Sequence, residues 1–153
     1  MAKASQAGES ALDPRVAESF QKLHSLELSG VVRYLHYAHM IMGANRIPIV
    51  AWLKAQADEA MDHAWKLGEK MTAFHLHPEM RVQPIAESGK HSVLDVLKEA
   101  LDYERAGLDE YKAMLKVVLE TRPDDTALED FVRGFIAVEA AHLEDAGKML
   151  RTM

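Results

Sequence analysis

The segment from Phe135 to Ala146 reads Phe-Ile-Ala-Val-Glu-Ala-Ala-His-Leu-Glu-Asp-Ala, a largely apolar run with Glu139 and His142 near its centre. Glu139 and His142 are three residues apart, so on a helix they share one face. Phe135 and Ala146 lie on the same face, which we therefore expect to point into a protein core. A buried carboxylate without a partner costs several kcal/mol, so Glu139 requires a compensating group.

The rest of the sequence predicts four long helices and no strand, over residues 13–42, 48–74, 92–121 and 126–150. The first two and the last two helices are joined by about five and about six residues, which suits antiparallel hairpins. The 17 residues from His75 to His91 can span roughly 55 Å, more than the roughly 40 Å of a helix of about 27 residues. We therefore predict an all-α, up-up-down-down four-helix bundle over residues 13–153, with a long crossover between the second and third helices. Residues 1–12 are expected to form a flexible tail.

Three more ionisable residues lie near the middle of the other helices, at matching heights. Glu27 lies 18 residues before a turn centred on residue 45, and His63 lies 18 residues after it. Glu104 lies 19 residues before a second turn at residue 123, and Glu139 and His142 follow it by 16 and 19 residues. In an antiparallel hairpin equal separations mean equal heights, so we expect all five side chains to meet in one layer.

Composition narrows the class of protein. The chain has 153 residues, of which 48% are hydrophobic and 27% charged, so we expect one domain with a sizeable core. The formal net charge of −6 disfavours general nucleic-acid binding. The absence of cysteine excludes disulfides, thiolate metal sites and cysteine nucleophiles. Because there is neither an apolar leader nor a run of about 18 apolar residues, we expect a cytoplasmic protein that does not span a membrane.

The residue types indicate a metal centre. Carboxylates with a minority of imidazoles suit iron or manganese, and five such groups at one level favour two ions. Tyr34 follows Glu27 by seven residues on the same helix face, where it is a candidate to hydrogen-bond a ligand or to donate an electron. Taken singly, Glu27 or Glu104 could instead pair with a nearby arginine, and His63 could be an ordinary core histidine. The run Asp109-Glu110-Tyr111-Lys112 is interpreted as a solvated helix face.

The segments around these residues resemble those of the ferritin-like superfamily, and bacterioferritins in particular, over about Val16 to Leu150. The similar segments are Leu26-Glu-Leu-Ser-Gly-Val-Val-Arg-Tyr-Leu-His-Tyr-Ala-His-Met40, Ala60-Met-Asp-His-Ala64, Tyr103-Glu104 and Glu139-Ala-Ala-His142. The resemblance implies a di-iron site that is held by Glu27, His63, Glu104, Glu139 and His142, with Tyr34 beside it.

One ligand that the resemblance implies is missing. Ala60 stands where the second Glu-x-x-His motif of the family begins, so a bridging carboxylate is absent and ferroxidase activity is left open. Glu59 is a candidate substitute, because it lies only about 40° from His63 around a helix. The competing expectation is that Glu59 faces the inner surface of an assembly, as an acidic residue does in bacterioferritins. A single metal, an asymmetric pair and an impaired subunit are the alternatives.

Met61 matches the methionine that binds haem b at a two-fold subunit interface in bacterioferritins. It lies about 200° around the helix from His63, so it is an outward-facing candidate haem ligand, although an ordinary apolar contact in a helix-pair dimer fits as well. Because only 11 residues follow His142, we expect no counterpart of the short fifth helix of the larger ferritin cages. This favours a smaller, mini-ferritin-like homo-oligomer, with assembly alongside a related subunit left open. We likewise expect no counterpart of the basic DNA-binding tail of some mini-ferritins.

We therefore predict an iron-binding protein that oxidises Fe(II) and stores or detoxifies iron in an oligomeric shell. The alternative is a catalytically impaired subunit of such an assembly that binds haem or serves as an interaction partner. A third hypothesis is a di-metal oxidase for an organic substrate, which requires an open pocket beside the metals.

Overall fold

The computed structural model describes residues 12–151, and in this range the chain forms four helices and no strand. Their bounds are α1 (Pro14–Met40), α2 (Arg46–Ala73), α3 (Val93–Thr121) and α4 (Thr126–Met149). The predicted all-α four-helix bundle is confirmed. The predicted tail over residues 1–12 falls outside the described residues, except for Leu12.

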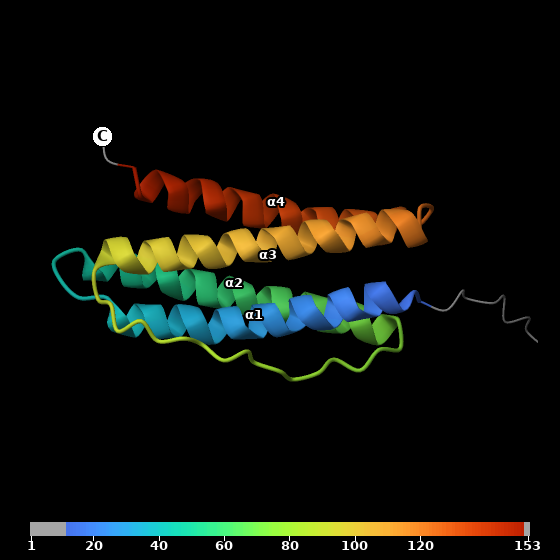
Figure 1. Cartoon of the computed structure of the whole chain (residues 1–153), viewed down its shortest axis with the longest axis horizontal. Coiled ribbons are helices and arrows are strands. Elements are labelled where there is room, and N and C mark those ends of the chain that lie inside the picture. Colours follow the sequence, from blue (N-terminus) through green and yellow to red (C-terminus); the bar gives the residue numbers. More distant parts are fainter. Residues whose placement is uncertain (1–11, 152–153) are drawn as a thin grey trace, which may run out of the picture.

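The helices pack as two antiparallel hairpins, α1 with α2 and α3 with α4, and α1 also packs against α3 (Figure 1). The crossover between α2 and α3 runs along the length of the bundle beside α1. Hydrogen bonds fix it there: the Gln21 side chain accepts from the Glu79 amide at 3.0 Å, and Ser29 Oγ accepts from the Gln83 amide at 2.8 Å. The two hairpins are therefore joined by a strap that is anchored to α1.

Two helix ends differ from the prediction. Helix α1 ends at Met40, because Ile41 is extended and Gly43 has a φ of +100°. The Arg46 guanidinium donates to the carbonyls of Ala38 and Ile41, which would otherwise lack partners at this end. Helix α2 then begins at Arg46, two residues before Pro48. Proline is tolerated in this first turn because amide groups there have no carbonyl partner within the helix.

Helix α4 begins at Thr126, as predicted. Asp125 is its N-cap, and the Asp125 carboxylate accepts from the Leu128 amide at 3.0 Å. The N-caps of α1 and α3, Asp13 and Ser92, accept hydrogen bonds from the amides of Arg15 and Asp95. An acidic N-cap both satisfies a free amide and interacts favourably with the helix dipole.

Two apolar clusters fill the bundle at different heights. One contains Phe20, Leu67, Met114 and Leu128, and the other is centred on residues such as Ile41, Leu53 and Val96. On α1, α2 and α3 the predicted ionisable residue lies between the residues of the two clusters, and on α4 Glu139 and His142 follow the residues of the first cluster. Apolar packing therefore flanks the layer on both sides along three helices and on one side along α4.

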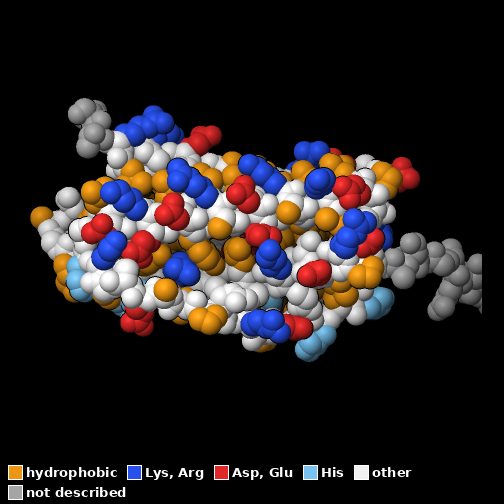
Figure 2. All heavy atoms as spheres, in the orientation of Figure 1, with side chains coloured by type: hydrophobic (Ala, Val, Ile, Leu, Met, Phe, Trp, Pro, Cys, Tyr) orange, Lys and Arg blue, Asp and Glu red, His pale blue; other side chains and the backbone are white. Residues whose placement is uncertain are grey.

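The outside of the bundle is polar and mixed in charge. On the face shown in Figure 2, basic and acidic side chains are interspersed, with apolar side chains between them. None of the described helices combines the length and the apolarity that crossing a membrane requires.

Candidate metal centre

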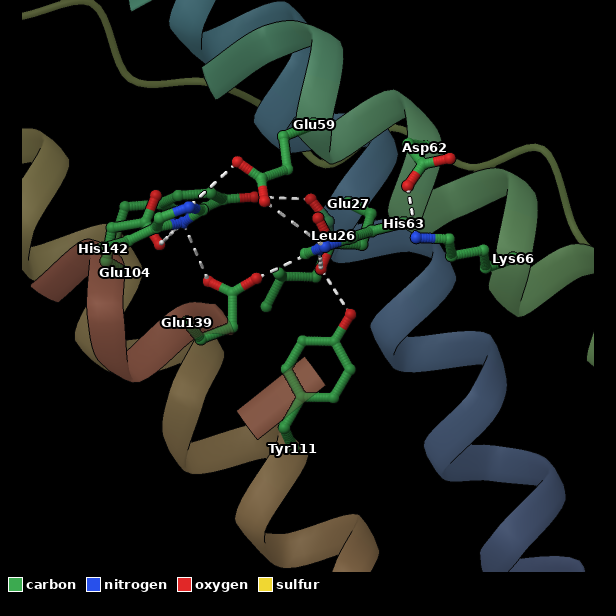
Figure 3. Close-up of polar contacts among 11 residues, drawn as sticks. Leu26, Glu27, Glu59, Asp62, His63, Lys66, Glu104, Tyr111, Glu139 and His142 are labelled. Atoms are coloured by element: carbon green, nitrogen blue, oxygen red, sulfur yellow. Dashed lines mark hydrogen bonds and ion pairs between the residues drawn. The ribbon is translucent and has the colours of Figure 1, made fainter. Parts of the chain in front are cut away.

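Each helix contributes to one cluster of ionisable side chains near its middle (Figure 3). Glu27 comes from α1, His63 from α2, Glu104 from α3, and Glu139 with His142 from α4. The structure thus brings together all five residues that the sequence predicted. Four are buried, and only the His142 side chain, 18% exposed, reaches the edge of the interior.

Both imidazoles turn the same ring atom toward the buried carboxylates. His63 Nδ1 lies 3.1 Å from Glu139 Oε1 and 3.5 Å from Glu27 Oε1. His142 Nδ1 lies 4.0 Å from Glu104 Oε2 and 4.0 Å from Glu139 Oε2. Each ring therefore offers Nδ1 as a donor atom to the centre, and its Nε2 points away from it.

The side chains form two donor sets with one member in common. The first is Glu27, His63 and Glu139, and the second is Glu104, Glu139 and His142; within each set the donor atoms lie within 4.8 Å of one another. Glu139 lies between the two imidazoles in Figure 3, with one carboxylate oxygen toward each. This arrangement makes Glu139 the carboxylate placed to bridge two ions.

Glu59 lies on the opposite side of the imidazoles. Its carboxylate is 2.9 Å from His142 Nε2 and 4.0 Å from His63 Nε2, and its side chain is 35% exposed. It belongs to neither donor set. Glu59 is thus close enough to pair with the His142 ring through Nε2, which leaves Nδ1 of His142 free to bind a cation, whereas His63 Nε2 lies beyond hydrogen-bond distance of Glu59.

Ala60 is buried at a close approach of α1 and α2. A Cβ atom built on Gly30 would lie 3.3 Å from the Ala60 Cβ and 3.5 Å from the Tyr103 ring. The small side chains at these two positions let the helices approach closely. Ala60 also lines a small cavity at the centre of the cluster, so a methyl group stands at the position where the resemblance implied a carboxylate.

Tyr111 is a site residue that the sequence analysis missed. Its predicted place on a solvated face was wrong: the side chain is fully buried, and its hydroxyl donates a hydrogen bond to Glu27 Oε1. Its ring stacks on Phe135, with centroids 5.0 Å apart. The available signal was spacing, since Tyr111 follows Glu104 by seven residues and therefore shares its helix face.

Tyr34 lines a small cavity at the centre of the cluster. This cavity has a volume of about 20 Å³, which suits one or two small ions or waters. The Tyr34 side chain is only 2% exposed, and its hydroxyl has no hydrogen-bond partner among the described residues. The ring packs edge-on against Tyr103 and Tyr37.

Met61 lies away from the cluster, on the outer face of α2. It is 57% exposed, and the neighbouring Trp65 is 69% exposed. Both side chains line a shallow surface groove with Leu28 and Met80. The outward direction expected for Met61 is thus observed.

Burial and the contacts among these side chains shift the pKa values within the cluster. Burial alone would lower the pKa of His63, but hydrogen bonding with Glu139 and Glu27 outweighs it and raises that pKa to about 9. Burial, reinforced by the neighbouring Glu139, raises the pKa of Glu104 to about 10. Burial also raises the pKa of Glu27. Burial acts the same way on Glu139, but hydrogen bonding with His63 and Glu104 outweighs it and lowers the pKa of Glu139.

The donor set fits divalent cations. Three buried carboxylates and two imidazoles form two groups that share one carboxylate, and oxygen-rich ligands with a minority of imidazoles suit iron or manganese. The protons on His63 and Glu104 are those that such ions would displace, because ligating carboxylates are ionised and ligating imidazoles neutral. Tyr34, with its free hydroxyl, is placed to donate a hydrogen bond to a ligand beside them.

Comparison with solved structures identifies proteins with the same fold. A ferritin-like, diiron-carboxylate protein from Bacillus anthracis superposes with a TM-score of 0.83 at 20% identity, covering 90% of this chain and 96% of that one. The Desulfovibrio desulfuricans bacterioferritin superposes with a TM-score of 0.77 at 23% identity, covering 90% and 78%. Chlorobium tepidum ferritin gives 0.80 at 18% identity, covering 91% and 84%.

Sequence comparison gives the family. No curated protein is similar enough in sequence to match this chain. The family model of the ferritin-like domain matches residues 17–153, which include all four helices apart from the first three residues of α1. Together with the fold and the clustered carboxylates, this match shows that the chain belongs to the ferritin-like family.

Proposed function

We propose that this protein binds two Fe(II) ions at the buried cluster and oxidises them with O₂ or peroxide. The observation that carries the proposal is the pair of donor sets that share Glu139. Two Fe(II) ions that share Glu139 can each give up one electron. Together they then reduce O₂ with two protons to hydrogen peroxide, or hydrogen peroxide with two protons to water. Fe(II) is the substrate in this reaction.

The residues have separate roles in the proposal. Glu27 and His63 hold one ion, Glu104 and His142 hold the other, and Glu139 bridges the two. Glu59 orients the His142 imidazole through Nε2, from which its carboxylate lies 2.9 Å away. Tyr111 holds the Glu27 carboxylate in place through its hydrogen bond. Tyr34 is the candidate to donate a hydrogen bond, or an electron, at the centre.

The test measures ion binding and oxidation together. Purified protein is titrated anaerobically with Fe(II) and then mixed with O₂ or hydrogen peroxide, while ferric absorbance is followed. We expect two ions bound per chain and rapid oxidation, both lost in Glu139→Ala and kept in Glu144→Ala, an exposed position on the same helix. Unchanged binding in Glu139→Ala would rule out the shared carboxylate. Faster oxidation in Ala60→Glu would show that the methyl group at this position limits the rate.

We also propose that copies of the chain assemble into a shell for iron storage or detoxification in the cytoplasm. The support is an apolar outer face on α1 and α2, where Val32, Leu35, Met61 and Trp65 are exposed. Two copies that met through this face would form a two-fold helix-pair dimer, and Met61 would then be placed to bind haem b. Light scattering of Trp65→Lys tests the dimer, and the haem absorption band of Met61→Leu tests the ligand.

A further inference from the structure

Three tyrosine rings pack together at the edge of the metal centre. Tyr34 and Tyr103 line the central cavity, and their rings pack edge-on with centroids 6.4 Å apart. The Tyr34 ring also packs edge-on against Tyr37, with centroids 6.2 Å apart. Phenol rings that pack together exchange an electron far more easily than rings that aliphatic side chains separate. An electron that an oxidant in the cavity takes from Tyr34 can therefore be replaced from a neighbouring ring.

A tyrosine that loses an electron also has to lose its hydroxyl proton, because the oxidised phenol is a strong acid. Neither tyrosine of the cavity has a base that would take this proton. The Tyr34 hydroxyl has no hydrogen-bond partner among the described residues, and the Tyr103 hydroxyl donates at 2.5 Å to the Leu26 carbonyl, a neutral acceptor. The Arg33 guanidinium also lies over the Tyr103 ring, 4.5 Å from its centroid, where a positive charge opposes removal of an electron.

Tyr37 differs from both of these rings. Its hydroxyl oxygen accepts a hydrogen bond from Arg33 Nη1 at 3.3 Å, so its own proton is not used in that bond. Burial raises the pKa of the Tyr37 hydroxyl, Arg33 lowers this pKa, and the Glu99 carboxylate raises it, as a nearby negative charge does. Glu99 lies on α3 between Val96 and Ala100, which pack in the same apolar cluster as Tyr37. Because Glu99 is only partly buried, a proton that it accepts can pass on to solvent.

The proposed reaction creates a need for an electron from the chain. Two Fe(II) ions supply both electrons that hydrogen peroxide takes on its way to water, but a chain that holds one Fe(II) ion supplies only one. The two donor sets differ in composition and in burial, so they fill at different iron concentrations and half-loaded chains arise. Reduction of peroxide by one electron releases a hydroxyl radical, which attacks the protein. A second electron from a tyrosine prevents this release.

We infer that Tyr37 supplies the second electron in a half-loaded chain through the ring of Tyr34, and that Glu99 accepts the proton that Tyr37 releases. This inference rests on the proposed oxidation of Fe(II). Hydrogen peroxide takes one electron from Fe(II), one from Tyr37 and two protons from solvent. Its O–O bond breaks, and the products are two waters, Fe(III), a Tyr37 phenoxyl radical and protonated Glu99. The next Fe(II) ion to bind reduces the radical, and Glu99 returns the proton.

The test mixes hydrogen peroxide with protein that holds one Fe(II) ion per chain, and freezes the sample rapidly for electron paramagnetic resonance. We expect a tyrosyl signal that is lost in Tyr37→Phe and in Tyr34→Phe but kept in Tyr103→Phe. Glu99→Gln keeps the shape of the side chain and cannot accept the proton, so it should also lose the signal. The matched control is Asp109→Asn, an exposed position on the same helix, which should keep it.

A second arm leaves iron out, so that failure of this inference and failure of the proposed function can be told apart. In metal-free protein, a soluble ruthenium(III) oxidant that a light flash generates should give a tyrosyl signal with the same dependence on Tyr37 and Glu99. Because Glu99 is partly exposed, Glu99→Gln decides the question even if Tyr37→Phe does not fold.

The outcomes separate the two claims. A tyrosyl signal that Tyr37→Phe or Glu99→Gln keeps would overturn the inference alone, as would rapid oxidation of Fe(II) without any tyrosyl signal in half-loaded wild type. Absence of Fe(II) oxidation would overturn the proposed function and this inference with it, whatever the metal-free arm shows.

Discussion

Replacing Glu139 by alanine should remove most of the stabilisation that metal ions give to this protein. Glu139 is the one side chain that belongs to both donor sets, whereas Glu27 belongs to only one. The Glu139→Ala variant therefore loses a ligand at both sites, and Glu27→Ala loses one at a single site. The relevant quantity is the difference in melting temperature between metal-loaded and metal-free protein, since effects on the apo-protein itself cancel.

The size of this difference follows from mass action. An ion at a free concentration of 100 times its dissociation constant adds about 2.7 kcal/mol to the free energy of unfolding, so two sites add about 5 kcal/mol. For a chain of 153 residues, each kcal/mol raises the melting temperature by about 2–4 °C. The wild type should thus gain about 10–20 °C on loading, and Glu27→Ala about half of that.

The assay is thermal unfolding followed by circular dichroism, with Co(II) or with a chelator. Glu144→Ala is the matched control, because it removes an exposed carboxylate from the same helix. Glu139→Ala should gain no more than a few degrees, and Glu144→Ala should gain as much as wild type. A full gain in Glu139→Ala would refute the assignment of a shared ligand, and a full gain in Glu27→Ala would refute the first donor set.

Three further outcomes are expected. The metal-free protein should melt at a lower temperature as the pH rises from 6.5 to 9. The reason is that folded His63, with a pKa of about 9, and folded Glu104, with a pKa of about 10, keep protons that the unfolded chain releases. A melting temperature that rises over this pH range would contradict these pKa shifts. Loading Co(II) at pH 7 should release about two protons per chain from the same residues, measured by calorimetry in buffers of different ionisation enthalpy. Gly30→Ala should be less stable than Gly134→Ala by about 1–3 kcal/mol in urea unfolding, because a Cβ at Gly30 meets Ala60 at 3.3 Å whereas Gly134 has open space.

The layer of ionisable residues could be predicted because it depends on quantities that a sequence contains. Helix lengths and turn positions fix the height of each residue, and the three-residue spacing of Glu139 and His142 fixes their common face. The long crossover likewise fixes the direction of the second hairpin. Helix ends were less predictable: α1 stops at Met40 rather than at residue 42, and the Arg46 guanidinium donates to the Ala38 carbonyl at this end.

The roles within the layer could not be predicted in the same way. Which carboxylate is shared depends on distances between helices, and these distances depend on packing such as the contact of Gly30 with Ala60. The rotation of the imidazoles, with Nδ1 inward and Nε2 toward Glu59, is a choice of rotamer that the sequence does not specify. Tyr111 was missed because its charged neighbours in sequence suggested an exposed segment, while its helix face pointed inward.

The distribution of donors between the hairpins has a consequence for the order of events in a newly made chain. The set of Glu104, Glu139 and His142 comes entirely from α3 and α4, whereas the other set needs α1 and α2 as well. If the proposed centre binds two cations, the ligands of one are therefore complete within the C-terminal hairpin, whereas the ligands of the other are complete only once the two hairpins have docked. Binding of the second cation would then report that the whole bundle has assembled.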